Sequence, residues 1–436
     1  MRLLNTQTLK FGEFFDKEIP KPYYILSHTW TRDEISFKEY SKGRNQDSSG
    51  YRKVDDFCTL VQGIHGPSWV WVDTICIDKR SSAELTEAIN SMWNWYWNAE
   101  ICYAYLDDVT TSAPNTEIGR HEEVSSLGEL RSQVESSKWF TRGWTLQELL
   151  APEQLIFVNR DWQIFGLKRD PMSYHNRYRY AMTEQFPIIV DALSKVTGIH
   201  TDYLSTRNSI GEASIACRLS WAARRETTRR EDKAYCLLGL MDINMPLLYG
   251  EGDRAFRRLQ EELVKSSDDQ SIFAWRSKRP NSRHIGMLAR EPADFKNCNH
   301  VSRKVAGTPL CTLEMAGRDI KVQGCVQTYE VDFEGFREFI EQAEGDHLGS
   351  IFLRMYERNK QGNLDLIRLT LGCYAGAEYK PVEIILARHA FGTNEAFVRF
   401  VFGQYVTSGT SRPFISTGRA TITVTAKAAA DAGWWC

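Results

Sequence analysis

The chain has 436 residues, with 54 Lys and Arg residues against 56 Asp and Glu residues and a formal net charge of −2. This length predicts two or three domains. The charged fraction of 25% and the hydrophobic fraction of 42% are ordinary for a folded protein, which excludes a disordered acidic or basic chain. They also give no overall signal for binding a polyanion.

Tryptophan is concentrated near the N-terminus. Nine of the 13 tryptophans lie within residues 1–162, where an even spread would place about five. This surplus predicts that the N-terminal third packs or binds with large flat side chains. Three of them, Trp93, Trp95 and Trp97, alternate along a predicted helix, so we expect at least one to be exposed or at an interface.

The cysteines and the apolar runs indicate the cellular compartment of the chain. The ten cysteines are scattered, with no Cys-x-x-Cys pair and no Cys/His cluster at zinc spacing, so we expect free buried thiols rather than disulfides or a metal site. The first ten residues lack the apolar run of a signal peptide. No stretch approaches the roughly 18 apolar residues of a membrane helix. We therefore predict a cytoplasmic protein without a membrane span.

Short apolar runs alternate with helical patterns in residues 1–165, which we predict to form the first domain. The apolar run at 23–27 predicts a buried strand, the apolar spacing at 51–64 a helix, and the aromatic run at 69–73 a second strand. Strand and helix patterns that repeat in this way predict an open, mainly parallel α/β sheet with helices on both faces.

The strongest predicted helix covers about 82–98, where Ser81 and Glu84 form a capping-box pattern. A polar loop is expected at about 110–136. The remaining elements of this domain are a strand at 101–106, a short helix at 144–150 and a strand at 155–158.

The rest of the chain divides into two further regions. Residues 166–270 are predicted to be mainly helical, and residues 271–436 to form a β-rich antiparallel domain, a sandwich or a barrel. Its β-like runs are 320–331, 350–356, 364–373, 382–388, 396–405 and 419–425.

Polar and aromatic residues follow the predicted strands of the first domain. In an open parallel sheet, ligands bind beyond the carboxyl ends of the strands. This rule points to Asp73 after the second strand and to the four residues at the end of the first, which are Ser27, His28, Thr29 and Trp30. His28 has no metal partner in the sequence pattern, and loop or helix capping is the favoured role of Asp73, so no metal site is predicted.

The short helix at 144–150 places Trp144 and Glu148 on one face, four residues apart. A carboxylate beside an indole ring is desolvated, which raises its pKa and suits acid–base work or the stabilisation of a developing cation. The spacing alone favours a structural reading of the pair, because most such pairs on helices are structural.

Two basic stretches are candidates for a nucleic-acid-binding surface. Residues 168–180 interleave arginine with tyrosine, and residues 218–233 carry six basic residues against three acidic ones. Neither has a recognition-helix or RNP-like pattern, and the net charge is slightly negative. A solvated face or a salt-bridge surface is favoured, and no nucleic-acid partner is predicted.

Several segments together resemble the fungal heterokaryon incompatibility (HET) domain. The resemblance covers about residues 1–165, and residues 219–260 resemble the region that commonly follows this domain. It implies a role in nonself recognition between fused fungal cells that ends in regulated cell death. The matching segments are 1–6, 24–30, 71–79, 87–92, 102–106 and 142–152.

The HET domain is in turn similar to TIR domains, some of which cleave NAD. This resemblance implies a TIR- or flavodoxin-like sheet, with Glu148 in the Trp-x-x-x-Glu-Leu helix and Ser27 at the end of the first strand. It implies that Glu148 orients the ribose and stabilises the charge that forms as nicotinamide leaves, while Trp30 or Trp144 stacks on a ring. The first loop departs from the TIR pattern, and Arg142 stands where TIR domains usually have Ser.

Two functions of different class follow. The first is an NAD glycohydrolase that needs no cofactor and takes NAD as its substrate. The second is a non-catalytic module that self-associates or binds other incompatibility proteins through exposed aromatic residues. The chain lacks a Gly-x-x-x-x-Gly-Lys-Ser/Thr loop, so nucleotide-driven assembly would need another protein.

Overall fold

The structure is a computed structural model. It describes residues 1–111, 120–168, 189–275 and 287–303, together with the strands at 311–316, 319–331, 364–375, 380–391, 394–400 and 416–424. The chain divides into two compact units. The first contains Met1–Gly211 and Arg225–Gly252, and the second contains Glu212–Arg224 and Asp253–Cys436. The region predicted as helical, 166–270, therefore contributes residues to both units.

The first unit is built on a seven-stranded sheet with the strand order β2-β1-β4-β3-β5-β6-β7. The four strands β4-β3-β5-β6 are parallel to one another, whereas β1 and β2 on one side and β7 on the other pair antiparallel. The predicted open and mainly parallel α/β sheet is confirmed. The strands are β1 (Arg2–Asn5), β2 (Phe11–Glu13), β3 (Tyr23–His28), β4 (Trp69–Trp71), β5 (Ile101–Tyr105), β6 (Leu155–Val158) and β7 (Ile164–Lys168).

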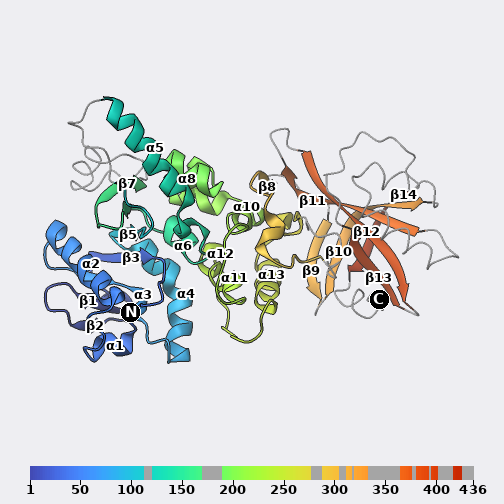
Figure 1. The fold of residues 1–436 in the computed structure, drawn as a ribbon. Coiled ribbons are helices and arrows are strands. Elements are labelled where there is room, and N and C mark those ends of the chain that lie inside the picture. Colours follow the sequence, from blue (N-terminus) through green and yellow to red (C-terminus); the bar gives the residue numbers. More distant parts are fainter. Residues whose placement is uncertain are drawn as a thin grey trace. The chain divides into compact units, whose positions relative to one another are not determined.

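Helices cover both faces of this sheet (Figure 1). Helix α2 (Ser49–His65) packs on one face, where the His65 ring stacks on Tyr24 of β3 at 4.2 Å. Helix α4 (Ser82–Asn98) lies on the other face, where the Tyr23 hydroxyl donates to the Trp95 carbonyl at 2.6 Å. Adjacent residues of β3 thus reach opposite helices, as the two-residue period of a strand requires.

The order of the parallel strands creates a crevice. From β3 the chain passes to β4 on one side, and then to β5 on the other side of β3. The helices that follow β3 and β4 therefore diverge to opposite faces and leave a gap beyond the carboxyl end of β3. Such a point of reversal is where open α/β sheets bind ligands.

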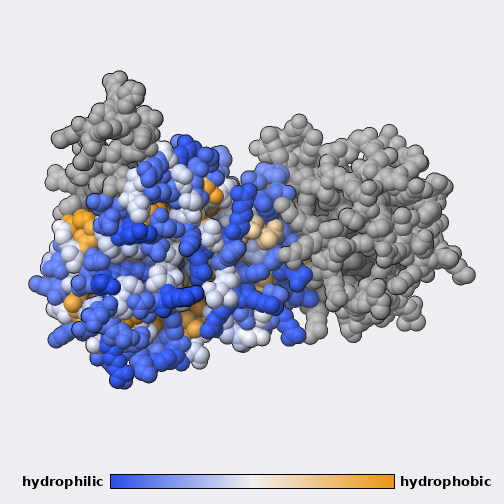
Figure 2. Space-filling view, in the orientation of Figure 1, coloured by the Kyte–Doolittle hydropathy of each residue, from blue (hydrophilic) through white to orange (hydrophobic). Residues whose placement is uncertain are grey.

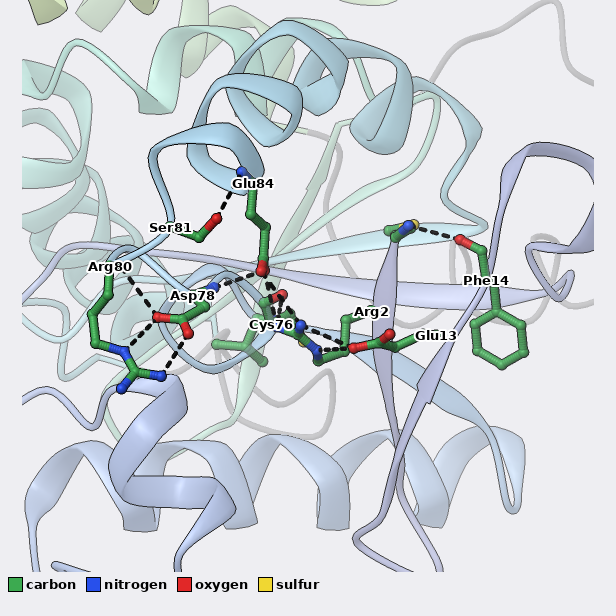
Figure 3. A network of polar contacts seen from close by, with 10 residues as sticks. Arg2, Glu13, Phe14, Cys76, Asp78, Arg80, Ser81 and Glu84 are labelled. Atoms are coloured by element: carbon green, nitrogen blue, oxygen red, sulfur yellow. Dashed lines mark hydrogen bonds and ion pairs between the residues drawn. The ribbon is translucent and has the colours of Figure 1, made fainter.

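A charged network fixes strand β1 to the loop between α3 (Asp73–Cys76) and α4 (Figure 3). Arg2 donates to the Glu84 carboxylate at 2.9 Å and to the Glu13 carboxylate at 3.0 Å. Glu84 also accepts the Asp78 backbone N–H at 2.7 Å, and the Ser81 side chain caps α4. Only half of the predicted capping box forms, because the Glu84 carboxylate is occupied by Arg2 and Asp78. The network holds the loop that carries Ile77 and Lys79 in place.

The polar loop predicted at 110–136 is wrong over its second half, where α5 (Arg120–Ser136) forms. The helix is polar almost throughout, and within its C-terminal part only Leu130 and Val134 are buried apolar residues. These two residues are four positions apart, so both can pack against the rest of the unit from one face of the helix. Two apolar residues are too few to give the hydrophobic periodicity by which a helix is predicted from sequence.

The tryptophans of α4 are each partly covered. Trp95 packs edge-on against Trp71 of β4 with ring centroids 5.6 Å apart, whereas Trp93 stacks on Trp97 at 6.3 Å. The Arg207 guanidinium lies 4.1 Å from the Trp97 ring centroid. All three tryptophans are half-buried, so none faces wholly inward as expected, but none of them is exposed either.

The first unit also contains several short helices and 3₁₀ turns. They are α1 (Phe37–Ser41), α6 (Thr145–Leu150), α8 (Val190–Thr197), η1 (Asp16–Glu18) and η2 (Lys138–Thr141). Further short segments follow along the chain: α9 (Thr201–Ser205), η3 (Arg207–Glu212), α11 (Asp232–Tyr235) and α12 (Leu238–Met241).

In the second unit every described strand pairing is antiparallel, as predicted. The sheet path is β13-β12-β11-β10-β14, with β8 on β11 and β9 on β10. Closure into a sandwich or a barrel stays a prediction, and the run at 350–356 lies outside the described residues. The strands are β8 (Val301–Arg303), β9 (Cys311–Ala316), β10 (Asp319–Val331), β11 (Leu364–Ala375), β12 (Lys380–Phe391), β13 (Asn394–Phe400) and β14 (Ser416–Val424). Its helices are α10 (Ile215–Ser220), α13 (Arg254–Ser266), η4 (Gln270–Phe273) and η5 (Pro292–Phe295).

The described surface is mainly hydrophilic on the face in Figure 2. In the described part of the chain no helix is long and apolar enough to cross a membrane. Among the described side chains, seven cysteines are free and buried, which agrees with the thiols predicted from the sequence; they are Cys58, Cys76, Cys102, Cys217, Cys236, Cys298 and Cys373.

Candidate functional site

A cavity of about 320 Å³ opens beyond the carboxyl end of β3, within the first unit. Its apolar wall comes from β3, from the loop after α3 and from α4: Leu26, Ile77, Leu85, Ile89 and Met92. Its polar and aromatic wall consists of His28, Trp30, Asp73, Lys79, Tyr96, Arg142, Trp144, Thr145, Glu148, Thr228, Arg229, Asp232 and Tyr249. A concave pocket that combines an apolar wall with convergent polar and aromatic groups is typical of a small-molecule site.

Glu148 on α6 is the central carboxyl group of this cavity. Its side chain is buried, and the Ser27 hydroxyl from the end of β3 donates a hydrogen bond to Oε2. The Trp139 indole N–H in turn donates to Ser27 Oγ at 2.8 Å, which leaves the serine proton directed at the glutamate. The chain of Trp139, Ser27 and Glu148 thus fixes the carboxyl group from residues that lie far apart in the sequence.

Burial raises the pKa of Glu148 to about 8. The hydrogen bond from Ser27 acts in the opposite direction, as does a hydrogen bond from the Tyr96 hydroxyl, while the nearby charge of Asp73 raises the pKa further. Both hydrogen-bond donors are neutral hydroxyl groups. The carboxyl group therefore changes its charge within the physiological pH range, as a catalytic acid, base or electrostatic group requires.

Arg225 is a cation whose charge acts on the Glu148 carboxyl group. It lies half-buried beside α6, where Nη1 donates to the Arg142 carbonyl at 2.8 Å and to Thr145 Oγ1 at 2.9 Å. Its positive charge lowers the pKa of Glu148, although less than burial raises it. Burial also lowers the pKa of Arg225 itself, to about 10.

His28 lies between two carboxylates at the side of the cavity. Its Nε2 atom is 3.7 Å from Glu34 Oε2 and 3.8 Å from Asp73 Oδ1. Its side chain is almost fully buried, and within the described part of the chain neither ring nitrogen has a hydrogen-bond partner. Lys53 neutralises Glu34 through a contact of 2.5 Å between Nζ and Oε1. The described residues include no group of three side chains suited to holding a metal ion.

Trp30 stands at the mouth of the cavity and is 52% exposed. Its indole N–H donates to Asp73 Oδ2 at 3.0 Å, and the Lys79 ammonium lies 3.4 Å from the ring centroid. The ring is therefore held in one orientation while its surface stays accessible, as a stacking platform for a flat ligand requires.

One wall of the cavity comes from residues 225–252, far along the chain from β3. Glu226 forms a parallel bridge with Arg142, and the Gly143 N–H donates to the Glu226 carbonyl at 2.8 Å. A Cβ atom on Gly143 would lie 2.5 Å from Thr227 Cγ2. Only glycine allows this close approach, which brings Thr228 and Arg229 into the cavity wall.

Asp232 and Tyr249 extend the same wall. The Tyr249 hydroxyl donates to Asp232 Oδ1 at 3.0 Å, and Trp144 also donates to this carboxylate. Burial raises the pKa of Asp232. Glu231 accepts the N–H groups of Gly250 and Gly252 at 2.8 and 3.0 Å and so closes the loop that presents Tyr249.

Most residues singled out by the sequence lie at this cavity. His28, Trp30, Asp73, Trp144 and Glu148 line it, and Ser27 lies directly behind Glu148. Thr29 does not line it, because its hydroxyl turns to the Asp107 carboxylate at 3.2 Å.

Sequence reasoning missed several residues of the site. Tyr96 lies on the buried face of α4 with Ile89 and Met92, where an apolar pattern gives no sign that its hydroxyl reaches Glu148. Trp139 was counted only as part of the tryptophan surplus. The residues of 225–252 carried a signal only through their resemblance to the region that follows a HET domain. The arginines and tyrosines of 169–180 lie outside the described residues.

Comparison with known proteins identifies the family. Residues 23–148 match the family described as heterokaryon incompatibility protein (HET). Vegetative incompatibility protein HET-E-1 of Podospora anserina is 38% identical over 256 residues, which cover 57% of this chain and 17% of that protein. The chain carries a HET domain. It spans about a sixth of the length of this curated relative.

The HET match ends at Glu148, the central carboxyl group of the cavity. Arg225, Thr228, Arg229, Asp232 and Tyr249 therefore lie beyond the matched HET segment, yet they belong to the same structural unit. Residues 254–318 match a domain of unknown function, DUF8212. No solved structure matches the chain.

Proposed function

We propose that the HET domain of this chain is an NAD glycohydrolase that acts in heterokaryon incompatibility. The observation that carries the proposal is the buried Glu148 at the cavity, with its pKa raised to about 8 and its carboxyl group fixed by Ser27. A carboxyl group held in this way beside an open pocket is the main element of glycoside cleavage.

The sheet topology supports a TIR- or flavodoxin-like assignment. Counted along the chain, the parallel strands β4-β3-β5-β6 have the order 2-1-3-4, which is the beginning of the flavodoxin-like order. The cavity lies where this order predicts a ligand, beyond the carboxyl end of the first parallel strand, β3.

The proposed reaction is hydrolysis of the bond between C1′ of the ribose and the nicotinamide nitrogen. The bonding electron pair goes to the nitrogen, so neutral nicotinamide leaves and positive charge develops at C1′ and the ring oxygen. The oxygen of a water molecule then bonds to C1′ and releases one proton, which gives ADP-ribose. No oxidant or reductant is needed.

Glu148 stabilises this charge in its ionised form. A cationic nicotinamide ring or a developing oxocarbenium ion beside the carboxyl group lowers its pKa, because an opposite charge favours the ionised state. Ionised Glu148 then attracts the transition state more strongly than the neutral product, as electrostatic catalysis requires. The proton-donating contact from Ser27 keeps the carboxylate aimed at the cavity.

The aromatic residues at the mouth provide the binding surface. Trp30 exposes its ring beside the cavity and Trp144 forms part of the wall. Stacking of the nicotinamide or adenine ring on either indole would contribute binding energy without distinguishing the ground state from the transition state.

The test is incubation of the purified chain with NAD and quantification of nicotinamide and ADP-ribose by chromatography. Glu148→Gln keeps the shape of the side chain and removes its charge, and we expect it to lower the cleavage rate at least 1,000-fold. Glu87→Gln is the matched control, since Glu87 is an exposed glutamate of α4 that does not line the cavity. Equal cleavage by the Glu148 and Glu87 variants, or no cleavage by the unmodified chain, would refute the proposal.

The incompatibility role is proposed from the family and from the relative in Podospora anserina. Expression of the chain in a fungal host tests it, with growth and cellular NAD measured together. We expect growth arrest with loss of NAD for the unmodified chain and neither effect for Glu148→Gln. Growth arrest that persists in Glu148→Gln would favour the alternative, an interaction module that signals through partners.

A further inference from the structure

We infer that Arg142 and Arg229 form a phosphate-binding edge of the cavity, which selects phosphorylated nucleotides over nucleosides. The inference deepens the proposed function and rests on it for the identity of the nucleotide. It concerns binding, so it can be tested separately from bond cleavage.

Among the described residues, the cavity wall carries both paired and unpaired positive charges. Lys79, Arg142 and Arg229 are the lysine and arginine side chains that line the cavity. Lys79 is committed to Asp73, at 3.6 Å, and to the Trp30 ring. Among the described residues no carboxylate lies within ion-pair distance of Arg142 or Arg229. Two guanidinium groups thus face one cavity without an ion-pair partner.

The second argument is that neutral groups hold both guanidinium groups in place. Arg142 Nη2 donates to the Thr228 hydroxyl at 3.4 Å, which uses one of its five N–H donors. The Arg229 guanidinium lies 4.5 Å from the centroid of the Tyr249 ring. A guanidinium that is oriented but not neutralised is suited to binding phosphate with two parallel hydrogen bonds.

The carboxylates on this wall do not cancel the positive charge. The Asp232 carboxylate accepts hydrogen bonds from Tyr249 and Trp144, and burial raises its pKa. Glu231 is occupied by the backbone N–H groups of Gly250 and Gly252. Arg229 acts on both carboxylates only through its charge at a distance, because neither forms an ion pair with it.

The third argument is the position of the edge relative to Glu148. Arg142 precedes α6 and Glu148 lies on it, and both side chains line the same cavity. In a nucleotide, the phosphate on C5′ and the base on C1′ belong to one ribose. A ribose held with C1′ at Glu148 therefore directs its phosphate toward another part of the same wall, and the arginine edge supplies the opposite charge there.

The experiment compares three substrates that share the scissile bond: NAD, nicotinamide mononucleotide and nicotinamide riboside. Only the first two carry phosphate. We expect Arg142→Ala and Arg229→Ala each to lower kcat/KM about 10- to 100-fold for NAD and for the mononucleotide, the usual loss for a charge-assisted hydrogen bond. For the riboside we expect a change of less than about twofold, because this substrate has no group for the arginines to bind. Arg52→Ala is the control for charge, since Arg52 is exposed on α2 and does not line the cavity.

Binding of ADP-ribose to Glu148→Gln, measured by calorimetry, is a readout that needs no cleavage. We expect the second substitution Arg142→Ala to weaken this binding at least tenfold, and Arg142→Lys to weaken it less. The lysine variant keeps the charge and replaces the alanine variant in every comparison if the latter does not fold, as judged by circular dichroism.

The outcomes separate the two proposals. If NAD is not cleaved but ADP-ribose binds in an Arg142-dependent manner, the proposed reaction fails and the phosphate edge stands. If NAD is cleaved and the arginine substitutions change cleavage of all three substrates by the same factor, or change none, the phosphate edge is refuted and the reaction stands.

Discussion

Two glutamates near the cavity show how their surroundings set opposite properties. Glu148 is buried against neutral hydroxyl groups, and burial raises its pKa to about 8. Burial also raises the pKa of Glu34, but the nearby His28 side chain and the contact with the Lys53 ammonium outweigh it, so that the pKa lies well below its usual range. A cation in contact with a carboxyl group keeps that group ionised, whereas neutral hydrogen-bond donors allow it to gain or lose a proton near neutral pH. The chain thus keeps a permanently charged carboxylate beside His28 and a titratable carboxyl group at the cavity.

The largest expected effect is on stability as a function of pH. Glu148 has an ordinary pKa of 4.5 and a folded-state pKa of about 8, so between these values the folded state holds a proton that the unfolded state has released. Its contribution is complete below the ordinary value and falls by about 1.4 kcal/mol per pH unit as the pH rises toward 8.

Urea denaturation at several pH values between 5 and 8 measures this slope. Glu148→Gln cannot titrate, so the difference in unfolding free energy between it and the unmodified chain should favour the variant increasingly as the pH rises. A difference that does not change with pH would mean that Glu148 is already ionised in the folded state.

The next effect concerns the fixed charge. Lys53→Met removes the ammonium group that contacts Glu34 and leaves a largely buried carboxylate without its closest cation. We expect a loss of about 3 kcal/mol in the free energy of unfolding, the usual result of breaking a buried ion pair from one side. The double variant Lys53→Met/Glu34→Gln should recover part of this loss. A loss below about 0.5 kcal/mol in the single variant would remove the contrast between the two glutamates.

Ser27→Ala is expected to have a smaller effect, on activity. The hydroxyl of Ser27 lowers the pKa of Glu148, so its removal raises this pKa above 8. NAD cleavage at pH 7 should fall about tenfold, because one pH unit in the pKa changes the ionised fraction by about that factor. Ser136→Ala, on the exposed face of α5, is the control. A rate unchanged in Ser27→Ala would show that the serine does not set the charge of Glu148.

The smallest effect is expected at the wall of the cavity. Gly143→Ala would place a Cβ atom 2.5 Å from Thr227 Cγ2 and 3.2 Å from Cys236 Sγ, which should cost about 1 kcal/mol of stability through overpacking. Thr227→Ser removes the methyl group and should relieve most of this cost. If the serine substitution gives no relief, residues 225–229 do not lie against Gly143.

The sequence allowed prediction of the elements whose signals are local. The central strands are apolar runs and α4 has a regular stripe, so the parallel sheet followed from their alternation. Strands β1 and β2 have only four and three residues, and such short strands form because a neighbouring strand pairs with them. Helix α5 was missed because two buried apolar residues give no clear period.

The site could be predicted only in part, because its contacts join distant parts of the chain. The rule on strand ends pointed to Ser27 and His28. The helical spacing alone favoured a structural role for Glu148, and only the resemblance to TIR domains assigned it a function. The contact between Ser27 and Glu148 spans 121 residues, and that between Ser27 and Trp139 spans 112. Arg225 and Arg229 reach the cavity because the chain returns to the first unit after residue 224. No local sequence pattern predicts contacts between residues this far apart in the chain.

The pH dependence of kcat/KM for NAD tests the central claim most directly, since it reports the ionisation of the free enzyme. The account predicts that kcat/KM rises about tenfold per pH unit from pH 5.5 and levels off near pH 8, the pKa of Glu148. It also predicts that Ser27→Ala moves this midpoint to higher pH. A flat profile between pH 5.5 and 8, with cleavage still dependent on Glu148, would contradict the claim that a titratable glutamate inside the cavity controls the reaction.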